Sequence, residues 1–153
     1  MVRQPTPRKL AAIMMADIAG FSRLMERDES ATFARLQHLR DTVTQPKIDA
    51  YGGRLVKTTG DGFLVEFASA TDALCCALDI QRDLTAREAE RSTDDRMRLR
   101  IGINVGDIIV DGDDVAGDGV NIAACLETLA PPDGICISGT VREQIHDDLG
   151  IAL

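Results

Sequence analysis

The stretch LAAIMMA (residues 10–16), followed at once by DIAG (residues 17–20), decides the fold of this chain. Seven apolar residues without a charge, ended by a turn that contains glycine, indicate a strand that is covered on both faces. The basic residues Arg3, Arg8 and Lys9 before it loosely imitate a secretory signal. No small-residue cleavage site follows, however, and the run is far shorter than a membrane span. We therefore expect a buried strand in a soluble, cytoplasmic protein that is not inserted in a membrane.

The overall composition is that of an acidic globular domain. The chain has 153 residues, of which 44% are hydrophobic and 27% charged, and its formal net charge is −8. A negative field of this size disfavours nucleic acid and anionic membranes as partners. The four cysteines and two histidines show no zinc-binding spacing, so reduced thiols are expected. We expect one domain over residues 1–153, with a flexible N-terminal segment at residues 1–8.

The first half of the chain shows a strand, a helix and a hairpin. Apolar residues recur at helical spacing up to about Pro46. Two glycines at 52–53 then break the chain. The turn signal TGDG (residues 59–62) joins two predicted strands at 54–58 and 63–67. The sequence SATD (residues 69–72) resembles a capping box, and it predicts the start of a second helix.

The second half adds two strands and two helices. Residues 99–105 read as a strand that continues across a bend at 107–110, and a Gly/Asp loop at 111–119 leads into a helix at 120–129. A short strand at 135–138 and a helix at 140–146 follow. The order predicts an α+β fold, a ferredoxin-like βαββαβ core with a C-terminal α-β-α extension, and helices on one face of an antiparallel sheet. Residues 149–153 look like the opening of another strand, so we expect a longer parent protein.

Two carboxylates stand at special positions of this predicted fold. Asp17 ends the first strand, and Asp61 lies between two glycines at the tip of the hairpin. In a βαββ core the first strand and this hairpin are neighbours, so both side chains can meet at one sheet edge. Hard oxygen ligands of this kind suit Mg²⁺ or Mn²⁺. The alternative is that each aspartate only stabilises its own glycine-containing turn.

Four blocks of the sequence resemble the motifs of the class III nucleotidyl cyclases, in the soluble bacterial form. They are MADIAGFS (15–22), KTTGDGF (57–63), RIGINVG (100–106) and GDGVNIAA (117–124). They follow one another in the order of that family, and the similarity runs over residues 9–150. The resemblance implies a nucleotidyl cyclase-like fold and a head-to-tail homodimer with active sites at the interface between the subunits.

The resemblance also implies roles for the residues of one subunit. Asp17, Asp61 and the backbone carbonyl of Ile18 would bind two divalent cations, Mg²⁺ or Mn²⁺, in each active site. Arg100 would contact the triphosphate of ATP. The turn formed by Ile18, Ala19, Gly20 and Phe21 leads into a helix, whose free N–H groups favour a polyphosphate.

The other subunit would read the base and the ribose. Lys57 donates to a ring nitrogen of adenine, Asp114 accepts from the 6-amino group, and Asn121 orients the ribose. A guanylate cyclase would be expected to carry an acidic residue in place of Lys57. Asp113 is adjacent to Asp114, so a shift of one residue in this loop stays open. We place the role on Asp114 because it stands three positions before Gly117, as in the family.

One residue departs from the family pattern. The family places an arginine four residues after Asn121, on the same helix face, where it stabilises charge on the phosphates. Here that position is Cys125. A neutral thiol cannot donate a bidentate, charge-assisted hydrogen bond. We expect a weakened adenylate cyclase that makes cyclic AMP for signalling. The alternatives are a catalytically silent nucleotide-binding or dimerisation domain, and an introduced change at Cys125.

Overall fold

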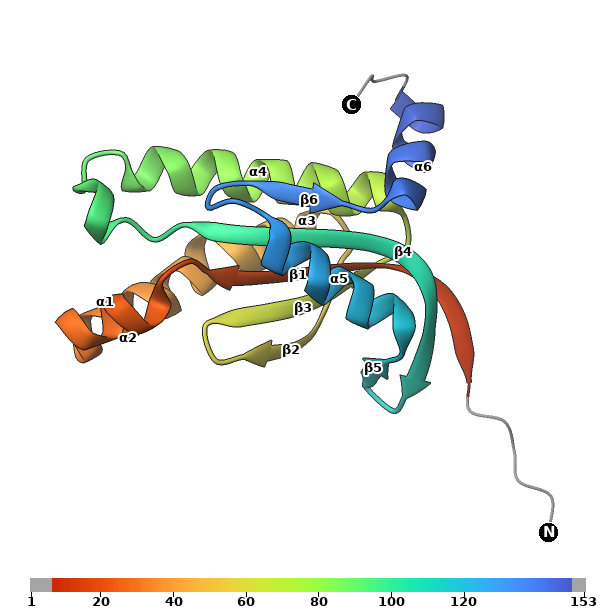
Figure 1. Cartoon of the computed structure of the whole chain (residues 1–153), viewed down its shortest axis with the longest axis horizontal. Helices are drawn as coiled ribbons and strands as arrows, with labels where there is room; N and C mark the ends of the chain where they lie inside the picture. Colours follow the sequence, from red (N-terminus) through yellow and green to blue (C-terminus); the bar gives the residue numbers. More distant parts are fainter. Residues whose placement is uncertain (1–6, 150–153) are drawn as a thin grey trace, which may run out of the picture.

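The computed structural model describes residues 7–149 and is organised around β1 (Arg8–Ile18), the middle strand of the sheet. The strand order is β2-β3-β1-β4-β5, and each neighbouring pair is antiparallel. A sixth strand pairs in parallel with β4 (Figure 1). The bounds of the other strands are β2 (Arg54–Thr59), β3 (Gly62–Phe67), β4 (Leu99–Asp111), β5 (Asp114–Ala116) and β6 (Ile135–Ile137).

The helices follow the predicted order, with more breaks than the sequence indicates. Asp28 and Ser69 cap α2 and α4, because their side chains accept hydrogen bonds from the backbone N–H groups of Ala31 and Asp72. The order β1–helices–β2–β3–α4–β4 confirms the ferredoxin-like core with a C-terminal extension. The helices are α1 (Phe21–Arg27), α2 (Glu29–Leu39), the π-helix η1 (Arg40–Thr44), α3 (Gln45–Ala50), α4 (Ala70–Glu88), the 3₁₀ turn η2 (Thr93–Asp95), α5 (Asp118–Leu129) and α6 (Gly139–Leu149).

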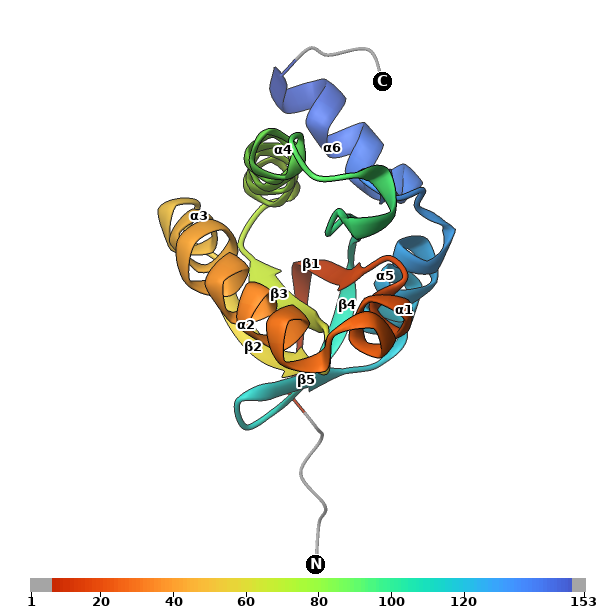
Figure 2. The same cartoon turned by 90° about the vertical axis from the view of Figure 1, so that its left-hand side faces the viewer.

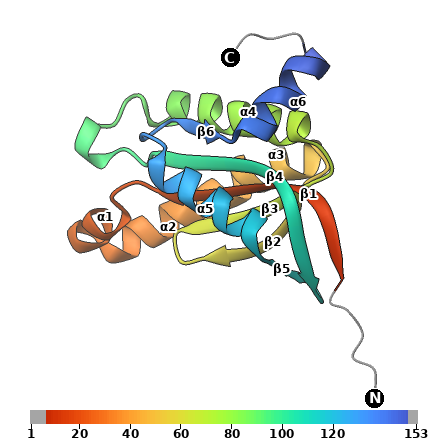
Figure 3. The ribbon, with the colours of Figure 1, turned by 45° about the vertical axis from the view of Figure 1, so that its right-hand side comes forward.

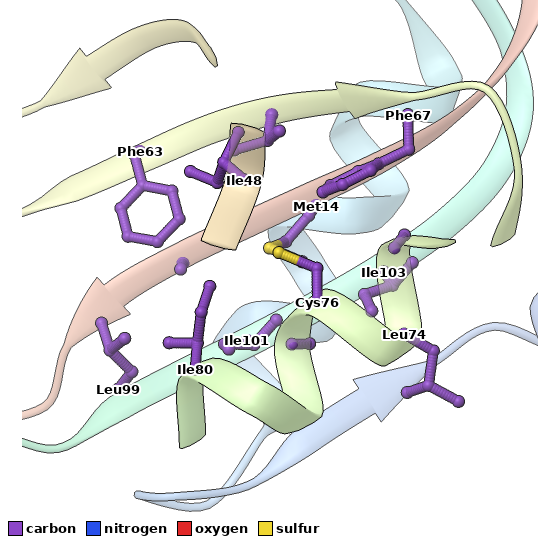
Figure 4. Close-up of a cluster of buried hydrophobic side chains, with 14 of the residues drawn as sticks. Met14, Ile48, Phe63, Phe67, Leu74, Cys76, Ile80, Leu99, Ile101 and Ile103 are labelled. Atoms are coloured by element: carbon purple, nitrogen blue, oxygen red, sulfur yellow. The ribbon is translucent and has the colours of Figure 1, made fainter. Parts of the chain in front are cut away.

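The main core fills the sheet face that α4 covers. Met14 of β1 and Ile101 and Ile103 of β4 are fully buried there. Cys76 and Ile80 of α4 point toward these strands (Figure 4). Burial of large aliphatic side chains is the main favourable term in folding, so this face holds the framework on which the site is built.

The expectation that the helices share one face of the sheet is wrong for α5. Ala123 of α5 packs in a second cluster with Ile13, Leu64 and Ile108, whose side chains point away from the main core. Figure 2 shows the strands between α3 and α5. Gly102 allows this packing, because a Cβ there would lie 2.2 Å from the backbone nitrogen of Glu127.

Several predicted boundaries also change. The strand predicted at 99–105 and 107–110 is one continuous strand, β4, and the predicted loop at 111–119 contains β5. Arg8, which we expected in a flexible segment, opens β1, and residues 1–6 of that segment lie outside the described residues. The strand expected from residue 149 onward also falls beyond them, apart from its first residue, which ends α6. Within residues 7–149, no helix has the length and apolar character to cross a membrane.

Candidate active site

The β2–β3 hairpin brings Asp61 to the end of β1. Gly60 has φ 62°, a backbone conformation that glycine adopts without strain. Gly62 lies so close to β1 that a Cβ there would be 2.4 Å from the carbonyl oxygen of Ala16. The Oδ2 atom of Asp61 accepts a hydrogen bond of 2.9 Å from the backbone N–H of Ile18. The two glycines therefore allow the turn and the close approach that place Asp61 beside Asp17.

Arg40 fastens this hairpin from the helical side. Its Nη2 atom donates to the carbonyl oxygen of Gly60 at 2.6 Å and lies 3.5 Å from that of Gly62. These two carbonyl groups flank Asp61. Arg40 is the first residue of η1, and π-helical segments occur frequently at functional sites. Sequence reasoning missed Arg40, since nothing in its local pattern indicates a contact 20 residues away.

Asp17 is engaged by Arg100 in the described structure. The two residues are directly opposite in the β1–β4 pairing. Arg100 donates from Nε to Oδ1 at 3.0 Å and from Nη2 to Oδ2 at 2.8 Å, a bidentate pair. The hydrogen bond to Asp17 raises the pKa of Arg100. Sequence reasoning named both residues, and the structure brings them into contact.

Glu127 is a third carboxyl group at this place, and the motifs of the sequence do not indicate it. It lies on α5 with 8% of its surface exposed, and its Oε1 atom is 3.5 Å from Nη2 of Arg100. Burial first, and then the hydrogen bond and negative charge of Asp17, together raise the pKa of Glu127 to about 7, although the charge of Arg100 opposes them. The signal that could have found it is its position four residues after Ala123, on the buried stripe of α5.

The turn after Asp17 is held to the neighbouring strand segment. The backbone N–H of Ala19 donates to the carbonyl oxygen of Arg98 at 2.8 Å, and Gly20 has φ 67° just before α1 begins at Phe21. The guanidinium of Arg23 lies over this turn, since a Cβ on Gly20 would be 3.6 Å from its Nη2 atom. A cation at this turn is compatible with a polyphosphate.

Lys57 and Asp114 form an ion pair within one chain. The Nζ atom of Lys57 is 3.0 Å from Oδ1 of Asp114, and their side chains are 45% and 50% exposed. β4 curves so that β5 comes beside β2 (Figure 3). The hydrogen bond from Lys57 lowers the pKa of Asp114. The neighbouring residue Asp113 is held differently, since its backbone carbonyl oxygen accepts a hydrogen bond from Arg54. In this structure the partner of Lys57 is therefore Asp114.

Asn121 and Cys125 lie apart from these contacts, on the outer side of α5. Both residues are exposed. In the described part of the chain, neither side chain makes a hydrogen bond or an ion pair with another residue. Their positions four residues apart place them on the same helix face.

The donor set at the end of β1 fits divalent cations. The carboxyl groups of Asp17 and Glu127 lie 2.8 Å and 3.5 Å from the guanidinium of Arg100, and the charge of Asp61 acts on the same guanidinium from the hairpin tip. Among residues 7–149, no group of three or more His, Cys, Asp and Glu side chains is arranged to hold a metal ion without further ligands. Two aspartates with a backbone carbonyl would leave coordination positions for phosphate and water, as Mg²⁺ and Mn²⁺ require.

Comparison with known proteins identifies the family. The model of the adenylate and guanylate cyclase catalytic domain matches residues 4–150, so the chain belongs to this family. It is 44% identical over 146 residues to "Putative adenylate cyclase 3" of Rhizobium meliloti, covering 95% of this chain and 25% of that protein. It is 34% identical over 134 residues to an adenylate cyclase of Streptomyces coelicolor, covering 88% of this chain and 34% of the relative.

A solved structure agrees with the fold. The crystal structure of an adenylate/guanylate cyclase/hydrolase from Silicibacter pomeroyi has a TM-score of 0.88 and 44% identity to this chain, covering 95% of this chain and 84% of that one. The chain thus spans about a quarter to a third of the two curated relatives but most of this solved domain. The sequence-based resemblance to nucleotidyl cyclases is confirmed.

Proposed function

We propose that this domain is an adenylate cyclase, which converts ATP to 3′,5′-cyclic AMP and pyrophosphate in the cytoplasm. Membership of the cyclase family and two relatives named adenylate cyclases support this reaction. The observation that carries the choice of ATP is the Lys57–Asp114 pair. A lysine donor beside a carboxylate acceptor matches the ring nitrogen and the 6-amino group of adenine. The edge of guanine presents the opposite pattern.

The residues at the end of β1 would hold two divalent cations, Mg²⁺ or Mn²⁺. Asp17, Asp61 and the carbonyl of Ile18 are the proposed ligands, on the strength of the hairpin contact between Asp61 and Ile18. When bound, such ions lower the pKa of the attacking hydroxyl group and stabilise the leaving oxygens. Arg100 is proposed to contact the triphosphate, and the turn from Ile18 to Phe21 to lie against it.

The remaining roles require a second copy of the chain. Asn121 and Cys125 are exposed on α5, and the Lys57–Asp114 pair is half-exposed. We propose a head-to-tail homodimer in which these residues complete the partner's site. Asn121 would orient the ribose so that its 3′-hydroxyl group attacks the α-phosphorus in line. Positioning and charge neutralisation supply most of the catalysis in phosphoryl chemistry, so no nucleophilic side chain is needed.

The test is a product assay on the purified chain. With ATP and Mn²⁺ we expect cyclic AMP and pyrophosphate in equal amounts, and a lower rate with GTP. The control is the Asp17→Ala/Asp61→Ala variant, analysed for dimer formation by sedimentation. A wild-type rate equal to that of a dimeric control would reject the enzymatic proposal.

A second candidate function is a nucleotide-binding regulatory domain without turnover. The specific observation in its favour is Cys125 at the position of the family arginine. This candidate predicts metal-dependent binding of ATP by calorimetry without cyclic AMP formation. Since the chain spans 25% and 34% of the two curated relatives, we also propose that a C-terminal domain of a longer protein regulates it.

A further inference from the structure

We propose that Arg54 and Glu66 are positioning residues that set the base preference of the site, because they hold Asp114 opposite Lys57. This inference rests on the proposed function, in which Lys57 and Asp114 read the adenine. Arg54 lies on β2 and Glu66 on β3, and both stand outside the four sequence blocks that resemble the cyclase motifs.

Arg54 bridges two elements that are far apart in the sequence. Its Nη1 atom donates to the carbonyl oxygen of Asp113 at 2.9 Å. Its Nη2 and Nε atoms donate to Oε1 of Glu66 at 2.8 Å and 3.3 Å. One end of the guanidinium is therefore fixed on the sheet, and the other end holds the residue immediately before Asp114.

Glu66 is a rigid anchor for this bridge. Its side chain is 10% exposed, although it lies directly opposite the half-exposed Arg54 in the β2–β3 pairing. Burial on its own would raise the pKa of Glu66, but hydrogen bonds from Lys9 and Arg54 outweigh it and lower the pKa below its ordinary value. A buried carboxylate with two cationic partners holds its position better than a surface carboxylate.

A bulge in β2 turns Lys57 toward the same side. Leu55 pairs with Val65, and the register then shifts so that Lys57 pairs with Leu64. Without the extra residue, Val56 would face Leu64 and Lys57 would belong to the opposite face of the sheet. Bulges re-aim side chains next to functional sites. The bulge therefore sets the direction of Lys57, and Arg54 sets the position of Asp114.

The β4–β5 turn needs this support because it has little of its own. β5 has three residues, and its pairing with β4 ends at Asp111 and Asp114. The residues between them include Gly112, whose φ of 59° lies in the left-handed region. Without Arg54, the Asp114 side chain would keep a local hydrogen bond of 2.8 Å from the backbone N–H of Val115 and the exposed contact with Lys57. The first joins neighbouring residues and does not tie the turn to β2, and exposed ion pairs contribute little.

The experiment compares base preference in Arg54→Gln and Glu66→Gln with wild type. We expect kcat/KM for ATP to fall about tenfold, mainly through KM, while kcat/KM for GTP changes less, so that the ATP/GTP ratio falls. The double variant should lower the ratio no further than Arg54→Gln, because both changes break one bridge. Arg54→Lys should restore part of the ratio. An unchanged ratio in variants that fold and dimerise would overturn the inference.

Hydrogen exchange provides a readout that does not depend on turnover. Amide exchange at residues 112–115 should become faster in Arg54→Gln and stay at the wild-type rate in Arg82→Gln. Arg82 is a matched control, since its side chain is 77% exposed on α4. Equal exchange rates in Arg54→Gln and wild type would reject the proposed role of Arg54 in holding the β4–β5 turn, even if the domain turned over no nucleotide. Absence of turnover in wild type with faster exchange in Arg54→Gln would count against the proposed function alone.

Discussion

The guanidinium of Arg100 donates to both carboxylate oxygens of Asp17, at 3.0 Å from Nε and 2.8 Å from Nη2. The same two oxygens are the proposed metal ligands. Arg100 and a divalent cation would therefore compete for Asp17. The carboxyl group of Glu127, 3.5 Å from Nη2 of Arg100, offers the guanidinium a second partner near its present position. Binding of the metal would free Arg100 for the triphosphate.

The competition predicts opposite effects of one substitution on two ligands. Arg100→Gln removes the guanidinium group that pairs with Asp17, so Mn²⁺ should bind to this carboxylate several-fold more tightly in the absence of nucleotide. The same change removes a charge-assisted contact to the phosphates, so the KM for ATP should rise roughly tenfold or more. Electron paramagnetic resonance of free Mn²⁺ measures the first effect, and steady-state kinetics the second. Weaker Mn²⁺ binding in the variant would contradict this competition.

The raised pKa of Glu127 predicts that the stability of the metal-free protein depends on pH. Its pKa is raised from 4.5 to about 7 in the folded state, so between these values the folded state binds more protons than the unfolded state. The stability that neutral Glu127 contributes is complete below about pH 4.5 and is lost as the pH rises through about 7. The amide in Glu127→Gln cannot lose a proton and stays neutral at every pH in this range. Relative to wild type, its free energy of unfolding should therefore rise from pH 5 to pH 8.

Urea denaturation in the presence of a chelator measures this difference. Each pKa unit corresponds to about 1.4 kcal/mol, so the gain of Glu127→Gln over this range is at most ~3 kcal/mol. Glu90→Gln, an exposed change just after α4, is the control and should follow the wild-type curve. If the curves of Glu127→Gln and wild type are parallel across this range, the carboxyl group does not titrate between the two values.

The sequence predicted the core fold because its signals are local. The apolar run 10–16, the TGDG turn and the capping Ser69 each specify one element from neighbouring residues. Their order then limits the topology. The position of α5 could not be derived in this way, because it depends on the closeness of Gly102 to the helix backbone. A helix pattern shows which face is buried, but it does not show which side of a sheet receives it.

The candidate site was predicted in part for a related reason. Asp17, Asp61 and Arg100 stand in short, distinctive blocks, and the structure brings them together. Arg40 and Glu127 act across the fold, and their contacts depend on tertiary packing. The bulge at Val56 has no marked local pattern, yet it decides which face Lys57 joins.

The contacts of Arg40 with the hairpin predict that replacing this residue weakens metal binding without unfolding the domain. Arg40→Gln removes the donor to the carbonyl groups on both sides of Asp61, so the hairpin tip should become more mobile. We expect Mn²⁺ affinity to fall several-fold and the melting temperature to fall by a few degrees, as for the loss of one or two hydrogen bonds. Calorimetric Mn²⁺ titration and thermal unfolding measure the two effects. Unchanged Mn²⁺ affinity would show that Asp61 is held without Arg40.

Cys125 predicts a gain of function on substitution. Cys125→Arg places a guanidinium on the exposed face of α5, four residues after Asn121. In the proposed dimer it would stabilise the charge that develops on the phosphates of the partner's site, and such arginines contribute large factors to phosphoryl transfer. We expect kcat for cyclic AMP formation to rise roughly 100-fold with a smaller change in KM.

Two variants separate this effect from a general change of the helix. Cys125→Ser keeps a small neutral side chain and should stay at the wild-type rate. Cys125→Arg combined with Asp17→Ala should lose the gain, because the arginine assists the reaction only where the proposed metal ligands are intact. If a dimeric Cys125→Arg protein turns over no faster than wild type, then the thiol is not what limits the rate. The silent nucleotide-binding domain would then be the better account of a chain that keeps Asp17, Asp61, Lys57 and Asn121.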